Sequence, residues 1–442
     1  MGLTGTRTYV GFGFGAIQAG LFVYEAYRSG NFGRLVVAEV LPAMVSGLRR
    51  AGGIYAVNIA HPDRIESAHI GPVEIYDPAS ARDREHLVDA LAEAQEIGTA
   101  IPSVTYYQSA GSGSLHRVLA EGLRRKATAC APTAVVYTAE NHNHAAEILE
   151  SSVLGEMLPA EQVAARTRVQ FLNTVIGKMS GVIADWEMIR EHQLATITPA
   201  EPRAFLVEAF NRILISRVQA GTVNAEPPFS RGIDVFEEKQ DLLPFEEAKL
   251  YGHNATHALA AYVGALAGAQ RIADLNAIPG ALAFLRTAFL EESGAALVRR
   301  HAGVDPLFTP EGYAHYADDL LGRMMNPYLL DTVDRVARDP ERKLGWNDRL
   351  VGTIRLALGH GVEPRRYAFG AAAALAMLDR SILEQGLPAK ALLAPLWYSA
   401  SPAQDEQEVV LDRIEAGLQQ LRAWCGSEFG NLEQLFRRTH GS

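Results

Sequence analysis

The sequence predicts a doubly wound α/β domain at residues 1–197 and a mainly α-helical domain at residues 198–442. Strand-like and helix-like segments alternate through the first part, which is typical of a parallel sheet with crossover helices. A glycine-rich turn follows the first strand. After residues 198–202, which read Thr-Pro-Ala-Glu-Pro, apolar residues recur mainly at helical spacing.

The individual elements follow from apolar runs and their spacing. Strands are expected at residues 9–12, 34–39, 54–59, 73–76, 103–108, 134–137 and 167–171, and helices up to about residue 27 and at 84–96, 115–125 and 144–154. In the second part, helices are expected at 258–269, 281–291, 313–321 and 369–378, and around the apolar series 409–421. The Pro- and Gly-rich segment 219–236 predicts a loop near the ligand site, which we expect in a cleft between the two parts.

A glycine-rich turn joins the first strand to the first helix. Gly13 and Gly15 begin it, and Gln18 stands where the usual G-x-G-x-x-G pattern has its third glycine. Such a turn lets backbone N–H groups approach a pyrophosphate at the start of a helix. The turn therefore predicts a Rossmann-like dinucleotide site, in which the cofactor-binding residues are Gly13, Gly15, Ala16, Ile17 and Gln18.

The second strand ends in a carboxylate, Glu39. A carboxylate at this place accepts hydrogen bonds from the diol of the adenosine ribose, and it repels a 2′-phosphate. The next residues, Val40 and Leu41, are apolar and provide no basic partner for such a phosphate. NAD is therefore the expected cofactor. The alternative is an ordinary glycine-rich turn followed by a solvated glutamate.

Polar residues follow the strand at 134–137, at the strand end where open α/β sheets place ligands. We expect Glu140 or Asn141 to lie near the nicotinamide ribose. His142 and His144 come next, and metal binding is the alternative that they raise. No third His, Cys or carboxylate at a familiar ligand spacing accompanies them, so the sequence predicts no metal site.

The segment 249–257 carries an amine, an amide and an imidazole at the spacing K-x4-N-x2-H. On a helix that begins near Asn254, Asn254 and His257 share a face, and Lys249 lies about one turn earlier. Oxidation of an alcohol needs a base for the hydroxyl proton and donors for the oxygen that becomes anionic. The segment therefore predicts Lys249, Asn254 and His257 as catalytic residues. The alternatives are structural: a surface cation, a helix cap and a satisfied buried imidazole.

Composition disfavours several classes of partner. The net charge is −10 and no run of Lys and Arg is dense enough to follow a phosphate backbone, so we expect no nucleic-acid binding. The early apolar stretch 9–24 contains several glycines and lacks a charged start, so we expect neither a signal peptide nor a membrane span. Cys130 and Cys425 fit no disulfide or metal spacing. These features predict a cytoplasmic protein with a small-molecule substrate, either a monomer or a small homo-oligomer.

Several segments, in a fixed order, carry a likeness to a known family. They lie at residues 13–20, 138–141, 171–174, 243–250, 291–295, 321–323, 326–329, 338–344 and 348–350, together with the pair Asn254 and His257. With these segments the chain resembles the polyol-specific long-chain dehydrogenases, the mannitol dehydrogenase family, and most of all its mannitol-1-phosphate 5-dehydrogenase branch.

The resemblance implies a role for each matching residue. Lys249 corresponds to the general base, Asn254 and Asn173 to an oxyanion hole, and His257 to a residue that holds the substrate oxygen. Glu246 corresponds to a glutamate near a proton and water channel. The resemblance also implies NAD-dependent hydride transfer, without a metal ion, between a polyol phosphate of the mannitol 1-phosphate type and a ketose phosphate of the fructose 6-phosphate type.

Three departures from the branch leave the substrate open. Gln18 replaces a glycine common in the phosphate-specific branch, Asn173 is more typical of members acting on free polyols, and the first half of the chain is longer than in compact phosphate-specific members. The enzymatic alternative is the same chemistry on a free polyol and ketose or on a hexuronate and aldonate pair. The non-enzyme alternative is a dinucleotide-binding regulatory protein, which the joint presence of a base and oxyanion donors disfavours.

A basic cluster near residues 335–349 bears on the question of a phosphate. Arg342, Lys343 and Arg349 coincide with the phosphate-branch motif, and guanidinium groups bind phosphate by paired hydrogen bonds. Acidic residues are interleaved with them, which is also the pattern of a solvated face. The three residues are therefore candidate ligands of a substrate phosphate, with a solvated face as the alternative.

Overall fold

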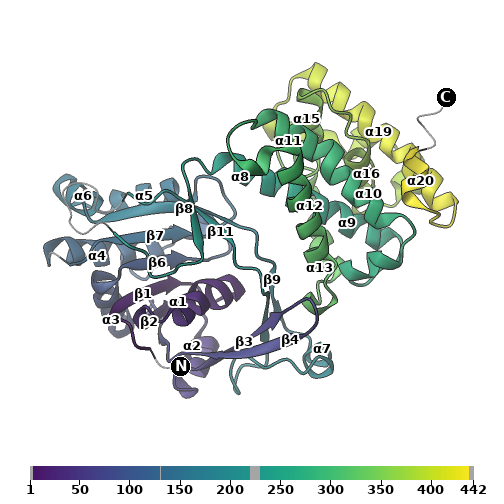
Figure 1. The fold of residues 1–442 in the computed structure, drawn as a ribbon. Helices are drawn as coiled ribbons and strands as arrows, with labels where there is room; N and C mark the ends of the chain where they lie inside the picture. The colour runs from purple at the N-terminus through teal and green to yellow at the C-terminus, as the bar shows by residue number, and fades with distance from the viewer. Residues whose placement is uncertain (1–2, 130, 220–228, 438–442) are drawn as a thin grey trace. The chain divides into compact units, whose positions relative to one another are not determined.

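The computed structural model describes residues 3–129, 131–219 and 229–437 (Figure 1). Contacts within the chain divide it into two compact units, which meet in the sequence between Leu243 and Pro244. This division falls later than the expected boundary at 197/198, because three strands within residues 204–239 complete the sheets of the first unit.

The main sheet of the first unit contains eight described strands in the order β12-β11-β8-β7-β6-β1-β2-β5. Their bounds are β1 (Arg7–Phe12), β2 (Phe32–Ala38), β5 (Glu74–Tyr76), β6 (Glu96–Thr99), β7 (Ala134–Thr138), β8 (Val169–Ile176), β11 (Ile213–Ser216) and β12 (Phe236–Lys239). Neighbouring strands from β5 to β8 are parallel, whereas β11 runs antiparallel to β8. The expected parallel sheet is confirmed.

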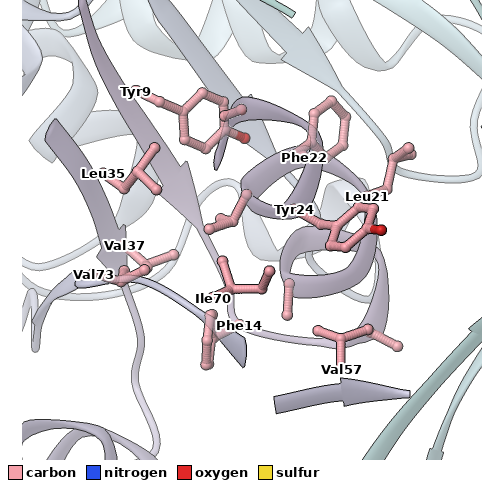
Figure 2. Packing of buried hydrophobic residues seen from close by; sticks show 14 of the residues in the cluster. Tyr9, Phe14, Leu21, Phe22, Tyr24, Leu35, Val37, Val57, Ile70 and Val73 are labelled. Carbon is pink, nitrogen blue, oxygen red and sulfur yellow. The ribbon is translucent and has the colours of Figure 1, made fainter. Parts of the chain in front are cut away.

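Helices cover both faces of this sheet. They are η1 (Gln18–Val23, a π-helical turn), α1 (Tyr24–Ser29), α2 (Pro42–Arg50), α3 (Ala81–Glu93), α4 (Leu115–Thr128), α5 (Ala145–Gly155) and α6 (Pro159–Arg166). Because side chains alternate along a strand, Val10 packs on α3 and α4 in one core cluster, whereas Tyr9 belongs to the other. Figure 2 shows this second cluster, where Tyr9 and Leu35 lie near Phe22 of η1.

A second, smaller sheet lies in the same unit, in the order β4-β3-β10-β9. Its strands are β3 (Tyr55–Ala60), β4 (Ile65–Ile70), β9 (Ser180–Ile183) and β10 (Ala204–Glu208). A further helix of this unit, α7 (Trp186–Glu191), lies beside β4 of this smaller sheet (Figure 1). The strand expected at 54–59 exists, but it belongs to this sheet and not to the main one. The expectation of a helical pattern from residue 198 is wrong for 204–216, because short apolar runs such as Ala-Phe-Leu-Val do not distinguish a strand from a helix.

The strand expected at 103–108 is wrong, because residues Val104–Tyr106 form a short 3₁₀ turn, η2. The strand between β1 and β7 is β6, whose sequence Glu-Ile-Gly-Thr has only one large apolar residue. Gly98 is required there because a Cβ would lie 2.2 Å from the hydroxyl of Tyr9. The carboxylate of Glu96 accepts hydrogen bonds from Tyr137 and from backbone N–H groups, so β6 is buried without an apolar pattern.

Residues 229–235 lie at the opposite end of the sheet from the expected ligand site. Arg7 at the start of β1 donates to Ser230, and the amide of Asn31, just before β2, donates to the carbonyl of Gly232 (2.8 Å). The N–H of Gly232 in turn donates to Glu96 at the start of β6. This part of the predicted loop is therefore not near the carboxyl ends of the strands; residues 220–228 lie outside the described residues.

The second unit is helical, as expected, and is drawn from green to yellow in Figure 1. Its α-helices and π-helical turns are α8 (Leu243–Glu247), η3 (Ala248–Asn254), α9 (Ala255–Leu266), α10 (Ala281–Thr287), η5 (Ala288–Gly294), α11 (Ala295–Arg300), α12 (Pro310–Met324), α13 (Val333–Ala337), α14 (Pro340–Lys343), α15 (Val351–Gly359), α16 (Arg365–Leu378), α17 (Ser381–Glu384), α18 (Ala389–Trp397), α19 (Gln404–Gly426) and α20 (Leu432–Arg437). Short 3₁₀ helices lie between them: η4 (Ile272–Ala277), η6 (Pro306–Phe308), η7 (Pro327–Leu329) and η8 (Tyr398–Ala400). Both η3 and η5 are π-helical turns, a geometry often found at functional sites. Within the described ranges, no helix has the length and apolar character needed to cross a membrane.

Candidate active site

The glycine-rich turn of the first unit has the shape of a dinucleotide cradle. Gly13 has a φ of +81°, and a Cβ there would lie 2.7 Å from the carbonyl oxygen of Ala100. At Gly15 a Cβ would meet no atom within 4 Å, so space remains open beside this backbone. The first intrahelical bond runs from Ala19 N–H to Gly15, which leaves the N–H groups of Ala16 and Ile17 for a ligand.

Gln18 is a buried side chain rather than a ligand-facing one. Its Nε2 donates to the Tyr9 hydroxyl (2.7 Å), and its side chain lies over Gly11 of β1. A Cβ on Gly11 would lie 2.0 Å from Nε2 of Gln18. The close approach of helix and strand that a third glycine usually permits is thus provided by a glycine in the strand. Only the backbone of Gln18 therefore remains available to a ligand.

Glu39 lies directly after β2 and is buried against the turn. Its carboxylate accepts hydrogen bonds from the backbone N–H groups of Phe14 (2.8 Å), Val40 (2.7 Å) and Leu41 (2.8 Å). The expectation of no basic neighbour is wrong, because Arg203 lies within electrostatic reach of Glu39. Arg203 is paired with Glu201 at 2.6 Å, and this hydrogen bond is the main cause that raises its pKa.

Glu140 and Asn141 occupy the carboxyl end of β7, as expected, but they differ in accessibility. The carboxylate of Glu140 is buried and accepts hydrogen bonds from the N–H of Ile101 (3.0 Å), the hydroxyl of Thr99 (2.8 Å) and the hydroxyl of Tyr107. Burial raises the pKa of Glu140. Glu140 therefore supports the strand ends, and the exposed Asn141 is the one open to a ligand. His142 and His144 belong to no group of three metal-binding side chains within the described ranges.

Asn173 lies on β8 and links that strand to the start of α5. Its Oδ1 accepts from the N–H of Ala146 and its Nδ2 donates to Glu147, both at 2.9 Å. An amide nitrogen carries two hydrogens, so one N–H remains for another acceptor. The two bonds fix the orientation of the amide, which a preorganised oxyanion donor requires.

The predicted catalytic segment of the second unit forms the π-helical turn η3 and the start of α9. Lys249 lies inside η3, Asn254 ends it, and His257 lies on the first turn of α9. The turn packs tightly, since a Cβ on Gly252 would lie 2.5 Å from the hydroxyl of Tyr313. Asn254 and His257 remain partly exposed, as groups that meet a ligand must be.

The amine of Lys249 lies in surroundings that favour its neutral form. Desolvation by burial, followed by the nearby Arg349, lowers its pKa to about 8, against the opposing effect of Glu246. A lysine side chain in water, with a pKa of about 10.4, is still almost fully charged at a pH of about 8. Lys249 can therefore alternate between amine and ammonium near neutral pH, as a general base must. Glu246, expected near a proton channel, is thus placed close enough to Lys249 to influence its pKa.

His257 has a buried carboxylate partner. Its Nε2 lies 3.0 Å from Oδ2 of Asp331, and Arg335 binds Oδ1 of the same carboxylate through Nε (2.8 Å) and Nη2 (2.7 Å). Burial by itself raises the pKa of Asp331, but His257 and Arg335 outweigh it and lower that pKa. Asp331 was not among the sequence candidates. The only sequence signal was an isolated carboxylate after the apolar pair Leu329 and Leu330.

The three candidate phosphate ligands differ in their surroundings. Lys343 is buried; its amine donates to the carbonyl of Arg338, and burial, then Arg349 and Arg342, lowers its pKa to about 8. Arg342 is half exposed and lies 3.7 Å from Asp348. Arg349 donates from Nε to Asp348 (2.8 Å) and is close enough to Lys249 to lower the pKa of that amine. Arg349 is therefore the cation nearest the predicted base among the three.

Comparison with known proteins agrees with these features. A model of the mannitol dehydrogenase C-terminal domain matches residues 241–414. Mannitol-1-phosphate 5-dehydrogenase of Bacillus licheniformis is 31% identical over 366 residues, which is 82% of this chain and 86% of the relative. The enzyme of the same name from Bacillus subtilis is 31% identical over 364 residues, with the same coverage. The chain belongs to the mannitol dehydrogenase family.

Solved structures show the same fold as this family member. A crystal structure of D-sorbitol dehydrogenase superposes with a TM-score of 0.73 at 15% identity, covering 96% of this chain and 94% of that one. Mannitol 2-dehydrogenase of Pseudomonas fluorescens, in a ternary complex with NAD and D-mannitol, superposes with a TM-score of 0.70 at 17% identity, covering 97% and 95%. Membership of the mannitol dehydrogenase family makes the chain an oxidoreductase.

Proposed function

We propose that this chain is an NAD-dependent dehydrogenase that interconverts a polyol phosphate, of the mannitol 1-phosphate type, and a ketose phosphate, of the fructose 6-phosphate type. The observation that carries the proposal is Lys249, whose pKa is lowered to about 8 by burial and by Arg349, on the same short segment as Asn254 and His257. The names of the relatives at 31% identity support the phosphorylated substrate.

In the direction of polyol oxidation, the neutral amine of Lys249 takes the hydroxyl proton of the substrate. Asn254, His257 and the remaining N–H of Asn173 are proposed donors to the oxygen as negative charge develops on it. NAD, when bound, supplies the acceptor for the hydride that leaves the carbinol carbon. In the reverse direction, the ammonium of Lys249 returns the proton to the ketone oxygen. The set of residues requires no metal ion.

The glycine-rich turn fits NAD by three features of its own. Gly13 adopts a positive φ, the space beside Gly15 is open, and the carboxylate of Glu39 is held at the end of β2. A carboxylate has about four acceptor sites, so one that accepts from three backbone N–H groups can still accept from one hydroxyl of a ribose diol. It opposes the dianionic 2′-phosphate of NADP, and Arg203 is already paired with Glu201.

We expect a catalytic efficiency with NAD that exceeds that with NADP by about a hundredfold or more, equivalent to ~2.7 kcal/mol. Glu39→Gln should reduce the ratio, because it removes the charge and keeps an acceptor for Phe14 N–H. The measurement is kcat/KM with each cofactor for both proteins. Asp63→Asn, which removes an exposed carboxylate of the same unit, should leave the ratio unchanged. Equal efficiency with NADP in the wild type would exclude the role given to Glu39.

The substrate test compares NADH consumption with fructose 6-phosphate, fructose and a keto-acid. We expect the phosphorylated ketose to give the highest kcat/KM, because each charge-assisted bond to a phosphate contributes about 1.5–3 kcal/mol. Arg349→Ala should raise KM for the ketose phosphate by at least about tenfold and leave KM for NADH unchanged.

Arg365→Ala is a matched control, since it removes an arginine of the same unit that stacks on Phe436 and lies outside the proposed site. A free ketose or keto-acid reduced as efficiently as the phosphate would favour the alternative substrates. Arg349 would then be assigned only to the tuning of Lys249.

A further inference from the structure

The turn before β10 brings a cation near Glu39, the carboxylate that we assign to the adenosine ribose. Arg203 directly precedes β10, and its guanidinium is close enough to Glu39 for the two charges to interact. The Arg203 side chain is 35% exposed, so a ligand can reach it. Dinucleotide sites use an acid at this place to bind the ribose diol of NAD, or a nearby arginine to bind the 2′-phosphate of NADP. This chain has both kinds of residue within reach of each other.

The backbone fixes the turn that carries Arg203. The N–H of Ile197 donates to the carbonyl of Arg203 (2.8 Å), and Thr198 pairs with Glu201 in an isolated β-bridge. The turn also packs on α2, the helix that follows β2, because a Cβ on Gly47 would lie 3.4 Å from the hydroxyl oxygen of Thr198. Arg203 therefore belongs to an ordered turn that is anchored on α2 and continues into β10.

Glu201 is the partner of Arg203 in this turn. Nε of Arg203 donates to Oε1 of Glu201 at 2.6 Å, and the side chain of Glu201 is only 8% exposed. The hydrogen bond from Arg203 is the main cause that lowers the pKa of Glu201, so this carboxyl is ionised at neutral pH. Among the described residues, no hydrogen bond involves Nη1 or Nη2 of Arg203. The outer N–H groups of the guanidinium are therefore available to a ligand.

We propose that Glu201 is a specificity-determining residue of the cofactor site, because its pairing with Arg203 offsets a positive charge that would otherwise attract the 2′-phosphate of NADP. The inference rests on the proposed assignment of the glycine-rich turn and Glu39 to NAD. Glu39 repels a 2′-phosphate directly, whereas Glu201 acts through Arg203. The two carboxylates and the guanidinium together leave a net negative charge. Without the carboxylates, the Nη groups of Arg203 can bind a phosphate by paired hydrogen bonds.

The first test measures binding of NADH and NADPH, which differ only in the 2′-phosphate, to the full-length protein by fluorescence at low ionic strength, where exposed charges are least screened. Glu201→Gln should lower the ratio of the NADPH to the NADH dissociation constant about tenfold, and Glu201→Gln with Glu39→Gln should lower it about a hundredfold. Glu150→Gln is the matched control, since it removes the carboxylate of another ion pair of this unit, with Arg166 at 3.2 Å, and should leave the ratio unchanged. An unchanged ratio in Glu201→Gln would overturn the proposal.

The second test asks whether Glu201 acts through Arg203. Adding Arg203→Gln to the Glu39→Gln/Glu201→Gln protein should return the ratio to within about twofold of that of Glu39→Gln alone. Arg203→Gln in the Glu39→Gln protein leaves Glu201 unpaired and should raise the ratio about tenfold, which tests the proposal even if Glu201→Gln disturbs the turn. A gain in NADPH binding that persists without Arg203, or no such rise, would overturn the proposal. If the wild type binds neither dinucleotide, the proposed cofactor site itself fails; if it binds NADH but reduces no ketose or keto-acid, the proposed dehydrogenase function fails while the ratios still decide the role of Glu201.

Discussion

Lys249→Ala is expected to lower kcat for polyol oxidation by about 10²–10⁴, the usual contribution of a positioned general base. The structural reason is the environment of the amine, whose pKa burial and Arg349 together lower to about 8. Dinucleotide affinity should change little, because the glycine-rich turn and Glu39 belong to the other compact unit. The measurements are kcat at saturating substrate and NADH affinity by fluorescence.

The pKa of Lys249 also determines how the two reaction directions depend on pH. Oxidation requires the neutral amine, so its rate should fall as pH drops below about 8; ketose reduction requires the ammonium and should fall as pH rises above about 8. Lys390→Ala removes an exposed lysine of the same unit and should leave both profiles unchanged. Near-normal turnover of Lys249→Ala would remove this residue from the mechanism.

Arg366→Ala is expected to destabilise the protein by about 3–5 kcal/mol, which is the cost of breaking a buried ion-pair network on one side. Arg366 lies between two buried carboxylates, with Nη1 3.4 Å from Glu292 and Nη2 3.1 Å from Glu433. Its removal leaves both acids without their shared cation. These ion pairs connect η5, the start of α16 and α20. The decrease in the free energy of unfolding should therefore be measurable by urea unfolding of the full chain.

The destabilisation by Arg366→Ala should depend on pH. Burial raises the pKa of Glu292 to about 7, partly offset by the backbone N–H groups of Arg366 and Tyr367 and by the Arg366 guanidinium. A carboxyl whose folded pKa is raised weakens folding as pH rises through that range, so the variant should lose more stability at pH 8 than at pH 5. Arg437→Ala is the matched control: Arg437 also contacts Glu433 but is 75% exposed, and its loss should cost less than about 1 kcal/mol. Equal losses in the two variants would contradict the role given to the buried network.

Those parts of the fold that depend on repeated local signals could be predicted from the sequence. The first strand, its glycine-rich turn and the acid after β2 have the expected order, and the apolar series near residue 414 forms α19. β6 could not be predicted because a central strand can be buried through Gly98 and a hydrogen-bonded Glu96 instead of through apolar side chains. Membership of β3 in a second sheet depends on β10, which comes far later in the chain.

In the candidate site, too, features that depend on local spacing could be predicted, whereas features that depend on tertiary contacts could not. The spacing of Lys249, Asn254 and His257 was sufficient to predict one segment, and these residues are together on η3 and α9. Spacing did not predict the π-helical form of that turn, in which Gly252 packs closely against Phe289 and Tyr313. Nor could it predict Asp331, whose place beside His257 arises from a tertiary contact. Residue type and position also predicted that Glu140 lies near the nicotinamide ribose, whereas its carboxylate accepts hydrogen bonds from Thr99 and from the N–H of Ile101.

The Gln18 side chain lies over Gly11, and this contact affects how a glycine-rich dinucleotide motif should be recognised in a sequence. A pattern search that scores position 18 alone records a missing glycine and a weaker dinucleotide motif. The amide of Gln18 fills the volume above Gly11 and meets the Tyr9 hydroxyl, so the distance between helix and strand is kept by a different distribution of atoms. Positions 11 and 18 are therefore sterically coupled, because a larger residue at position 11 requires a smaller one at position 18.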